Sequence, residues 1–170
     1  MNGELAKIRG DSRIQFRPMV ESDIGPLARL MAQTPLWQRY GLTEESAARR
    51  LREGLDQGAA IAVAEVAGAP DHEPAGFVWY AERGAFNRSG YIVLLGVRPD
   101  VRGQGIGRAL LEHAEAVLFA RSLDVFLLVS DFNRDAQRFY VRLGYQFVGA
   151  IPDYVAPGIT EMILFKRRAG

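Results

Sequence analysis

The sequence predicts one mixed α/β domain, and three observations lead to that fold class. Residues 91–97 and 125–129 are almost continuously apolar, which is typical of strands that are buried on both faces of a sheet. Between these runs, apolar residues recur at helical spacing over 106–118, which indicates a strand, helix, strand core. A chain of 170 residues with 48% hydrophobic content forms one core of ordinary size, so a second domain is not expected.

The other elements follow from local patterns taken in order along the chain. Ser22 and Thr43 are suited to cap two amphipathic helices, and Gly58 marks the end of the second. A turn-rich stretch over 83–90 precedes the first buried strand, and Gly144 stops the last helix. The expected strands are 14–16, 59–66, 75–80, 91–97, 125–129, 147–151 and 162–166, and the expected helices are 24–31, 43–57, 106–118 and 136–143. We therefore expect a twisted mixed sheet of about six or seven strands with roughly four helices.

Composition limits the class of protein. The first residues are polar and contain glycine, so we expect a flexible lead at 1–12 before a domain at 13–168. Basic and acidic residues nearly cancel at 21 against 20, which argues against a nucleic acid or an anionic membrane as partner. The chain has no cysteine and two separated histidines, so no thiolate chemistry and no metal site are expected. No segment resembles a signal peptide or a membrane span, which predicts a cytoplasmic protein.

The segment 97–108 carries the most chemical information. Its sequence, VRPDVRGQGIGR, connects a buried strand to an amphipathic helix. A helix N-terminus offers unpaired N–H groups and a positive dipole end, and the glycines at 103, 105 and 107 remove Cβ atoms where phosphate oxygens would approach. This arrangement predicts a pyrophosphate-binding loop. Glycines also build tight strand-to-helix turns, so the loop alone leaves a purely structural role open.

Two other phosphate-binding loops do not fit this segment. A dinucleotide-binding loop has the spacing G-x-G-x-x-G, whereas the spacing here is G-x-G-x-G. A nucleoside triphosphatase loop needs lysine and then Ser or Thr after its last glycine, and here Arg108 and Ala109 follow. Both classes are therefore excluded.

Three motifs in order resemble the GCN5-related N-acetyltransferases. RGQGIG at 102–107 matches the family signature R/Q-x-x-G-x-G/A, and VRP at 97–99 resembles the V-x-P that ends the family's fourth strand. Residues 133–145, with the pattern N-x-x-A-x-x-F-Y-x-x-x-G-Y, are similar to the downstream family motif. The resemblance covers about residues 91–147. It implies the acyl-CoA N-acyltransferase fold, acetyl-CoA as the cosubstrate, and direct attack by a primary amine of a small molecule or peptide.

The resemblance also implies which residues bind acetyl-CoA. Main-chain groups of Leu95, Gly96 and Val97 would bind the pantetheine arm, as a peptide adds to a sheet edge. Asn133 resembles a family asparagine that hydrogen-bonds the cofactor, and it also suits the N-cap of the helix that follows. The residues implied to hold the pyrophosphate are Arg102, Gly103, Gln104, Gly105, Ile106, Gly107 and Arg108.

Tyr140 resembles the family tyrosine that lies near the thioester sulfur and gives a proton to the departing thiolate. A phenol with a pKa of about 10 stays protonated at neutral pH and suits that role. Main-chain donors near the end of the fourth strand would stabilise the oxyanion. The alternative for Tyr140 is an ordinary core aromatic on a helical stripe.

The motifs say less about the general base and the acceptor site than about the residues that bind acetyl-CoA. In the ribosomal-protein N-terminal acetyltransferases that share the motif, a glutamate lies five residues before the asparagine, and here that position is Leu128. Glu82, at the end of the third strand, is the first candidate base, followed by Asp131 and Asp153. Each also fits a solvated turn residue.

Aromatic residues in turn-rich surroundings are the candidates for acceptor binding. They are Trp37, Tyr40 and Tyr154, and covering the core is their alternative role. The resemblance allows a homodimer. Two alternatives to an N-acetyltransferase stay open: a domain that senses acyl-CoA without turnover, and a transferase of a longer acyl group. The sequence does not identify the amine.

Overall fold

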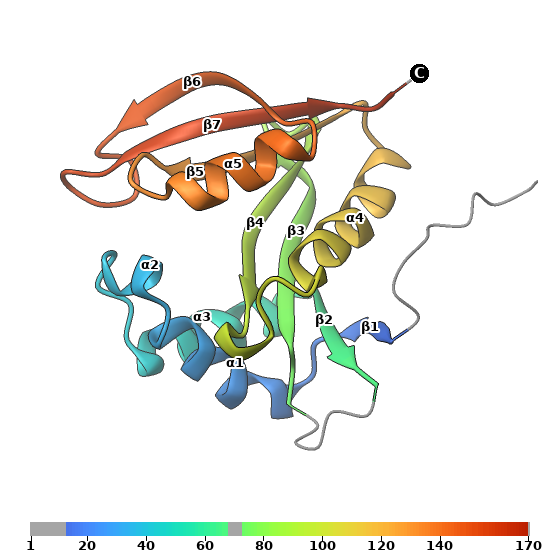
Figure 1. Ribbon diagram of the computed structural model, residues 1–170, viewed down its shortest axis with the longest axis vertical. Helices are drawn as coiled ribbons and strands as arrows, with labels where there is room; N and C mark the ends of the chain where they lie inside the picture. The colour runs from blue at the N-terminus through green and yellow to red at the C-terminus, as the bar shows by residue number, and fades with distance from the viewer. Residues whose placement is uncertain (1–12, 68–72, 170) are drawn as a thin grey trace, which may run out of the picture.

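The computed structural model describes residues 13–67 and 73–169, so the expected lead at 1–12 lies outside the described residues. They form one seven-stranded mixed sheet in the order β1-β2-β3-β4-β5-β7-β6 (Figure 1), which confirms the predicted fold class. The strands are β1 (Ile14–Pro18), β2 (Ala60–Val66), β3 (Gly76–Ala85), β4 (Ser89–Val97), β5 (Asp124–Ser130), β6 (Gln146–Pro152) and β7 (Thr160–Arg167). The helices are α1 (Ile24–Ala32), α2 (Pro35–Gln38), α3 (Glu44–Asp56), α4 (Ile106–Phe119) and α5 (Arg134–Arg142), with short 3-10 turns at Glu21–Asp23 and Pro99–Val101.

The β4–β5 pair is parallel, and the other neighbouring strands pair antiparallel. A parallel pair needs a crossover, which α4 supplies. The register of β4 with β5 covers only Gly90–Ile92 against Val125–Leu127. In Figure 1, β5, β6 and β7 lie together with α5 at one end, and β4 runs away from them toward α1. The sheet therefore divides at this point into two halves.

Two hydrophobic clusters cover opposite faces of the sheet. On β2, Ile61 and Val63 pack with α1 and α3, whereas Ala62 and Ala64 join the cluster that contains α4. This alternation follows from the period of two along a strand. Tyr140 of α5 belongs to the same cluster as α4, so α4 and α5 share one face. The core holds both halves of the sheet in place around their point of divergence.

The structure differs from the expected elements at several positions, and it adds the short helix α2, which was not expected. The stretch 83–90 is a hairpin instead of a long turn, because β3 continues to Ala85 and β4 begins at Ser89. Phe86 and Asn87 make the turn with φ of 55° and 52°, the left-handed conformation that tight hairpins use. The expectation that Ser22 caps α1 is also wrong, since Ser22 lies within the 3-10 turn Glu21–Asp23 and Asp23 is the N-cap residue of α1.

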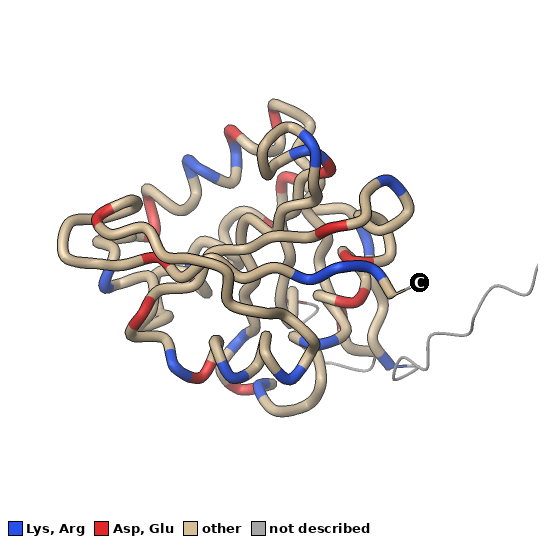
Figure 2. The backbone as a smooth tube through the Cα atoms, turned by 90° about the horizontal axis from the view of Figure 1, so that it is seen from above, with Lys and Arg blue, Asp and Glu red and all other residues tan. Residues whose placement is uncertain are grey.

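Charged residues of both signs are interspersed over the described chain (Figure 2), apart from a basic run at 166–168 near its end. Across the described ranges, no helix combines the length and the apolar character that crossing a bilayer requires.

Candidate functional site

A cavity of about 370 Å³ opens where β4 and β5 diverge. Beyond Ile92, the edge of β4 that faces β5 no longer has a strand partner there. Both diverging strands contribute to the wall, together with α1, the segment from α2 to Leu42, α3, α5, the β6–β7 loop and β7. The lining residues are Met31, Leu36, Trp37, Tyr40, Leu42, Arg50, Tyr91, Ile92, Val93, Leu94, Leu95, Leu127, Leu128, Val129, Ser130, Asn133, Ala136, Tyr140, Tyr154, Val155 and Glu161.

The glycine-rich loop leads from the end of β4 into α4. Gly103 and Gly105 have φ of 78° and 84°, and a Cβ atom at either position would meet nothing within 4 Å. The first N–H groups of α4 have no carbonyl partner within the helix. The loop therefore presents open backbone and the positive end of a helix dipole, a combination that suits a phosphate group.

The other two glycines of this region differ in how tightly they are packed. A Cβ atom on Gly107 would lie 3.4 Å from Val97 Cγ2, which is an ordinary van der Waals contact between α4 and β4. At Gly96 a Cβ atom would lie 2.7 Å from the Trp37 ring and 2.8 Å from that of Phe77. Trp37 can pack against the end of β4 because residue 96 has no side chain.

The cationic residues of the loop bind groups of the chain itself. Arg102 Nε donates to the Val97 carbonyl at 3.3 Å, and Arg108 Nε donates to Glu112 Oε1 at 2.7 Å. Both arginines are exposed, so each can change its partner at little cost. Their role toward a phosphate stays a prediction.

Asn133 and Tyr140 both line the cavity from α5. The Asn133 side chain accepts the Ala136 N–H at 3.2 Å and so caps the helix. Tyr140 is buried, with ring centroids 5.1 Å from Phe139 and 5.6 Å from Tyr145. Burial, and then the charge that Tyr91 carries when ionised, raise the pKa of Tyr140 above its usual value. Tyr140 therefore holds its proton at neutral pH.

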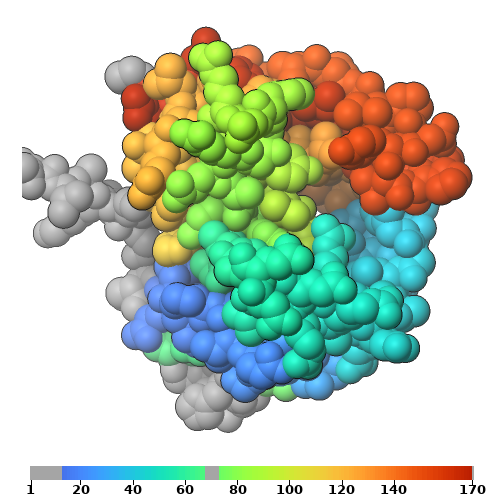
Figure 3. Space-filling model, turned by 180° about the vertical axis from the view of Figure 1, so that it is seen from behind, coloured from blue at the N-terminus to red at the C-terminus, as the bar shows by residue number. Residues whose placement is uncertain are grey.

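The carboxylates that the sequence suggested as bases lie outside the cavity wall. Glu82 is on the β3–β4 hairpin, which protrudes in green at the top of Figure 3, and it forms an ion pair with Arg121 at 3.4 Å. Asp153 Oδ1 accepts the Gly158 N–H at 2.6 Å in the β6–β7 turn. None of Glu82, Asp131 and Asp153 is among the lining residues. Within the described ranges, no group of three or more metal-binding side chains is present.

Glu161 lines the cavity and was missed by the sequence interpretation. It is 3% exposed on β7, and the Tyr40 hydroxyl donates to its Oε1 at 2.6 Å. The expected strand began at Met162, which left Glu161 in a loop, but β7 begins at Thr160. A single acid inside the apolar run 159–165 was the signal that could have found it.

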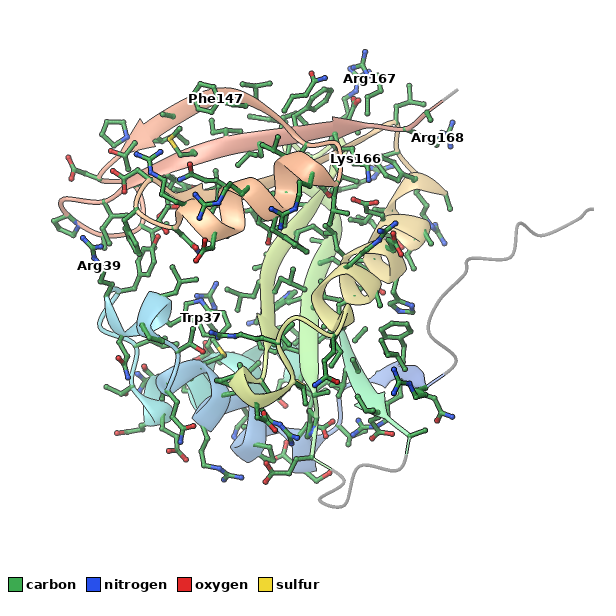
Figure 4. The ribbon with its side chains drawn as sticks, in the orientation of Figure 1. Trp37, Arg39, Phe147, Lys166, Arg167 and Arg168 are labelled. Carbon is green, nitrogen blue, oxygen red and sulfur yellow. The ribbon has the colours of Figure 1, made fainter. Side chains whose placement is uncertain are left out.

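Trp37, Tyr40 and Tyr154 all line the same cavity, although they come from distant parts of the chain. In Figure 4, Trp37 and Arg39 are labelled on the segment that includes α2. This segment faces the C-terminal half of the sheet. The Arg39 guanidinium lies 3.9 Å from the centroid of Phe132, and Tyr40 reaches Glu161. These contacts join the two halves of the sheet at one side of the cavity.

Comparison with known proteins gives the same assignment as the motifs. Residues 29–145, more than half of the chain, match the acetyltransferase (GNAT) family. An uncharacterized N-acetyltransferase of Methanocaldococcus jannaschii is 35% identical over 82 residues, which cover 47% of this chain and 53% of that protein. The blasticidin-S acetyltransferase of Streptomyces morookaense is 37% identical over 76 residues, covering 45% of this chain and 55% of that protein. The chain thus spans about half the length of these curated relatives.

A solved structure agrees over nearly the whole chain. The N-acetyltransferase of Thermoplasma acidophilum in complex with coenzyme A has a TM-score of 0.67 at 17% identity, and the match covers 91% of this chain and 99% of that one. At this identity the likeness shows the fold. Together with the family match over 29–145, it confirms the resemblance, and the chain belongs to the GNAT acetyltransferase family.

Proposed function

We propose that this protein transfers the acetyl group of acetyl-CoA to a primary amine. The observation that carries the proposal is the cavity at the divergence of β4 and β5, with the open glycine-rich turn and the first turn of α4 following the end of β4. A volume of about 370 Å³ lies within the usual range of small-molecule sites. The backbone groups that the divergence leaves unpaired suit an extended amide-containing arm.

The residues of the loop fit the charged part of acetyl-CoA. Gly103 and Gly105 leave room for phosphate oxygens beside the backbone, and the N–H groups of the first turn of α4 attract them. Arg102, Gln104, Ile106, Gly107 and Arg108 complete the binding segment. Leu95, Gly96 and Val97 offer the edge of β4, and Asn133 lies across the cavity on α5.

Acetyl-CoA, when bound, supplies an activated acyl carbon whose leaving group is a thiolate. Tyr140 holds a proton in a buried position on the cavity wall, and it is the general acid for that sulfur. Trp37, Tyr40 and Tyr154 form the side of the cavity that the acceptor enters.

The named relatives support acetyl transfer and differ in their acceptors. One is a blasticidin-S acetyltransferase and another is a peptidyl-lysine N-acetyltransferase of Salmonella typhimurium. The acceptor class of this chain therefore has to be inferred from the residues that line its own cavity.

The test is calorimetric titration of acetyl-CoA into the protein, followed by thiol release in the presence of primary amines. We expect saturable binding and amine-dependent thiol release. Folded protein that does not bind acetyl-CoA would refute the proposal. Binding without thiol release from any amine would favour the sensor alternative, and faster release from octanoyl-CoA would favour the longer acyl group.

A further inference from the structure

We infer that Glu161 binds the ammonium group of the acceptor and accepts its proton, so that the acceptor class is a cationic primary amine. This inference rests on the proposed acetyl transfer and concerns the same cavity. It assigns the general base to β7, a strand on which the family motifs place no residue.

The first argument is that Glu161 is a buried carboxylate without a cation. It is 3% exposed, and among the residues that the structure describes it forms no ion pair. The other buried glutamate, Glu115, is 7% exposed and pairs with Lys166 at 2.7 Å. Burying a carboxylate destabilises a fold unless a cation or hydrogen bonds compensate for the water that the carboxylate loses. Among the described residues, the Tyr40 hydroxyl is the side-chain hydrogen-bond donor to Glu161, so a positive ligand completes the surroundings of this carboxylate.

The second argument is a further unpaired polar group beside the carboxylate. Ser130 lies directly opposite Glu161 in the β5–β7 register, and cross-strand partners point to the same face. Ser130 is 2% exposed and lines the cavity, and its Oγ makes no hydrogen bond of normal geometry in the described part of the chain. It lies close enough to the Tyr40 hydroxyl to lower the pKa of Tyr40, so the two hydroxyls and Glu161 form one polar group on the cavity wall. A carboxylate and a hydroxyl that both accept hydrogen bonds match the several N–H donors of an ammonium group.

Aromatic rings complete the surroundings of the carboxylate. Burial and then the hydrogen bond to Glu161 raise the pKa of Tyr40 to about 12, so Tyr40 stays a donor at neutral pH. Burial raises the pKa of Tyr91 to about 12, with smaller contributions from the charges of Tyr154 and Glu161, which places Glu161 within electrostatic reach of Tyr91. The faces of Trp37 and of these tyrosines attract a cation.

The other charged residue that lines the cavity is Arg50 on α3. Its guanidinium lies 5.8 Å from the centroid of Trp79, and it forms no ion pair with Glu161 in the described residues. The charge of Asp131 also raises the pKa of Tyr40, so Asp131 lies within electrostatic reach of the Tyr40 hydroxyl. The charge of Arg50 lowers the pKa of Tyr91, so Arg50 lies within electrostatic reach of the cavity without forming an ion pair with Glu161 in the described residues.

The proton balance of the transfer follows from these positions. The ammonium gives one proton to the Glu161 carboxylate, which leaves a neutral amine with a lone pair. The bond from nitrogen to the acyl carbon forms as the carbon–sulfur bond breaks, the electron pair stays on sulfur, and Tyr140 gives the sulfur a proton. The second proton from nitrogen restores Tyr140, and Glu161 releases its proton to water. Ammonium and thioester thereby become amide, thiol and one free proton.

The test compares Glu161→Gln with Glu115→Gln as the matched buried control. The measurements are the melting temperature without ligand, the Kd of acetyl-CoA, and kcat/KM for phenethylamine, tryptamine, cadaverine and spermidine. For Glu161→Gln we expect a melting temperature higher by about 2–4 °C, an unchanged Kd, and kcat/KM lower by at least about 100-fold. For Glu115→Gln we expect a lower melting temperature, since Lys166 loses its partner, with kcat/KM unchanged.

Each result decides separately between this inference and the proposed function. A wild type that acetylates these amines and a Glu161→Gln variant that does so equally well would overturn the inference and leave acetyl transfer intact. A lower melting temperature for Glu161→Gln would also overturn it, because the carboxylate would then stabilise the free fold. If the wild type acetylates none of the four amines, the melting temperature of Glu161→Gln still tests the inference. An increase supports a buried carboxylate that lacks a cation, and a decrease overturns the inference. Absence of acetyl-CoA binding to the wild type would instead refute the proposed function.

Discussion

Replacing Gly105 with alanine separates the binding role of the loop from its structural role. Gly105 has a φ of 84°, and its added methyl group would meet no protein atom within 4 Å. The fold therefore has room for the side chain, and the structural cost is the left-handed backbone of an L-residue, about 1–2 kcal/mol. For a chain of this size that corresponds to a melting temperature lower by about 2–8 °C.

The effect on acetyl-CoA binding should be larger than this strain explains. The methyl group occupies the space in which a phosphate oxygen would approach the backbone. Losing one hydrogen bond to a charged group costs about 1.5–3 kcal/mol, which is roughly ten- to hundredfold in Kd. Calorimetric titration of acetyl-CoA measures the affinity, and thermal unfolding measures the strain.

Gly58 provides the matched control for this experiment. It has a φ of 70° at the end of α3, nothing lies within 4 Å of its added Cβ, and it lies outside the loop and the cavity wall. Gly58→Ala should lower the melting temperature by a similar amount and leave the Kd of acetyl-CoA unchanged. Equal Kd values for wild type, Gly58→Ala and Gly105→Ala would refute the assignment of the loop to phosphate binding.

Three further predictions test the site and the fold. Tyr140→Phe should lower kcat by about 10²–10⁴-fold with an unchanged Kd for acetyl-CoA, and unchanged turnover in the variant would remove the general-acid role. Because the pKa of Tyr140 is raised, the kcat of the wild type should not fall below pH 10 through loss of the Tyr140 proton. Asn133→Ala should cost about 0.5–2 kcal/mol in urea unfolding, and Asn133→Ser should restore most of it; a loss of acetyl-CoA affinity that serine does not restore would show a separate contact with the cofactor. Asp23→Asn should destabilise the protein by about 1.5–3 kcal/mol at pH 7. Burial alone would raise the pKa of Asp23, but the hydrogen bonds from Arg17 and the Val20 N–H outweigh burial, and the pKa of Asp23 is lowered. A lowered folded-state pKa means that this stability is present above the unfolded pKa and is lost as pH falls through the folded one, so the difference from wild type should shrink below about pH 4; a constant difference down to pH 2 would contradict it.

Local patterns were sufficient wherever the chemistry lies within a few consecutive residues. The loop 97–108 contains its glycines, the end of a strand and the start of a helix in one segment, so its geometry could be predicted from spacing. The buried strands β4 and β5 and the helix between them were predictable for the same reason, since continuous apolar runs and a helical stripe are local signals. Strand ends were less accurate, as the longer β3 and the earlier start of β7 show, because polar residues at a strand end resemble a turn.

The acceptor side of the cavity depended on contacts between distant residues. Tyr40 and Glu161 are 121 positions apart and form one hydrogen bond, and no periodicity in either segment indicates the other. Glu82 looked equally suitable as a carboxylate at a strand end, yet tertiary packing directs it to Arg121 on the surface. The sequence by itself determined the family, the fold class and the open, glycine-rich turn before α4, because each rests on short-range patterns along the chain. Only the tertiary structure decided which carboxylate is buried in the cavity without a cation, because burial depends on what the rest of the chain brings against it.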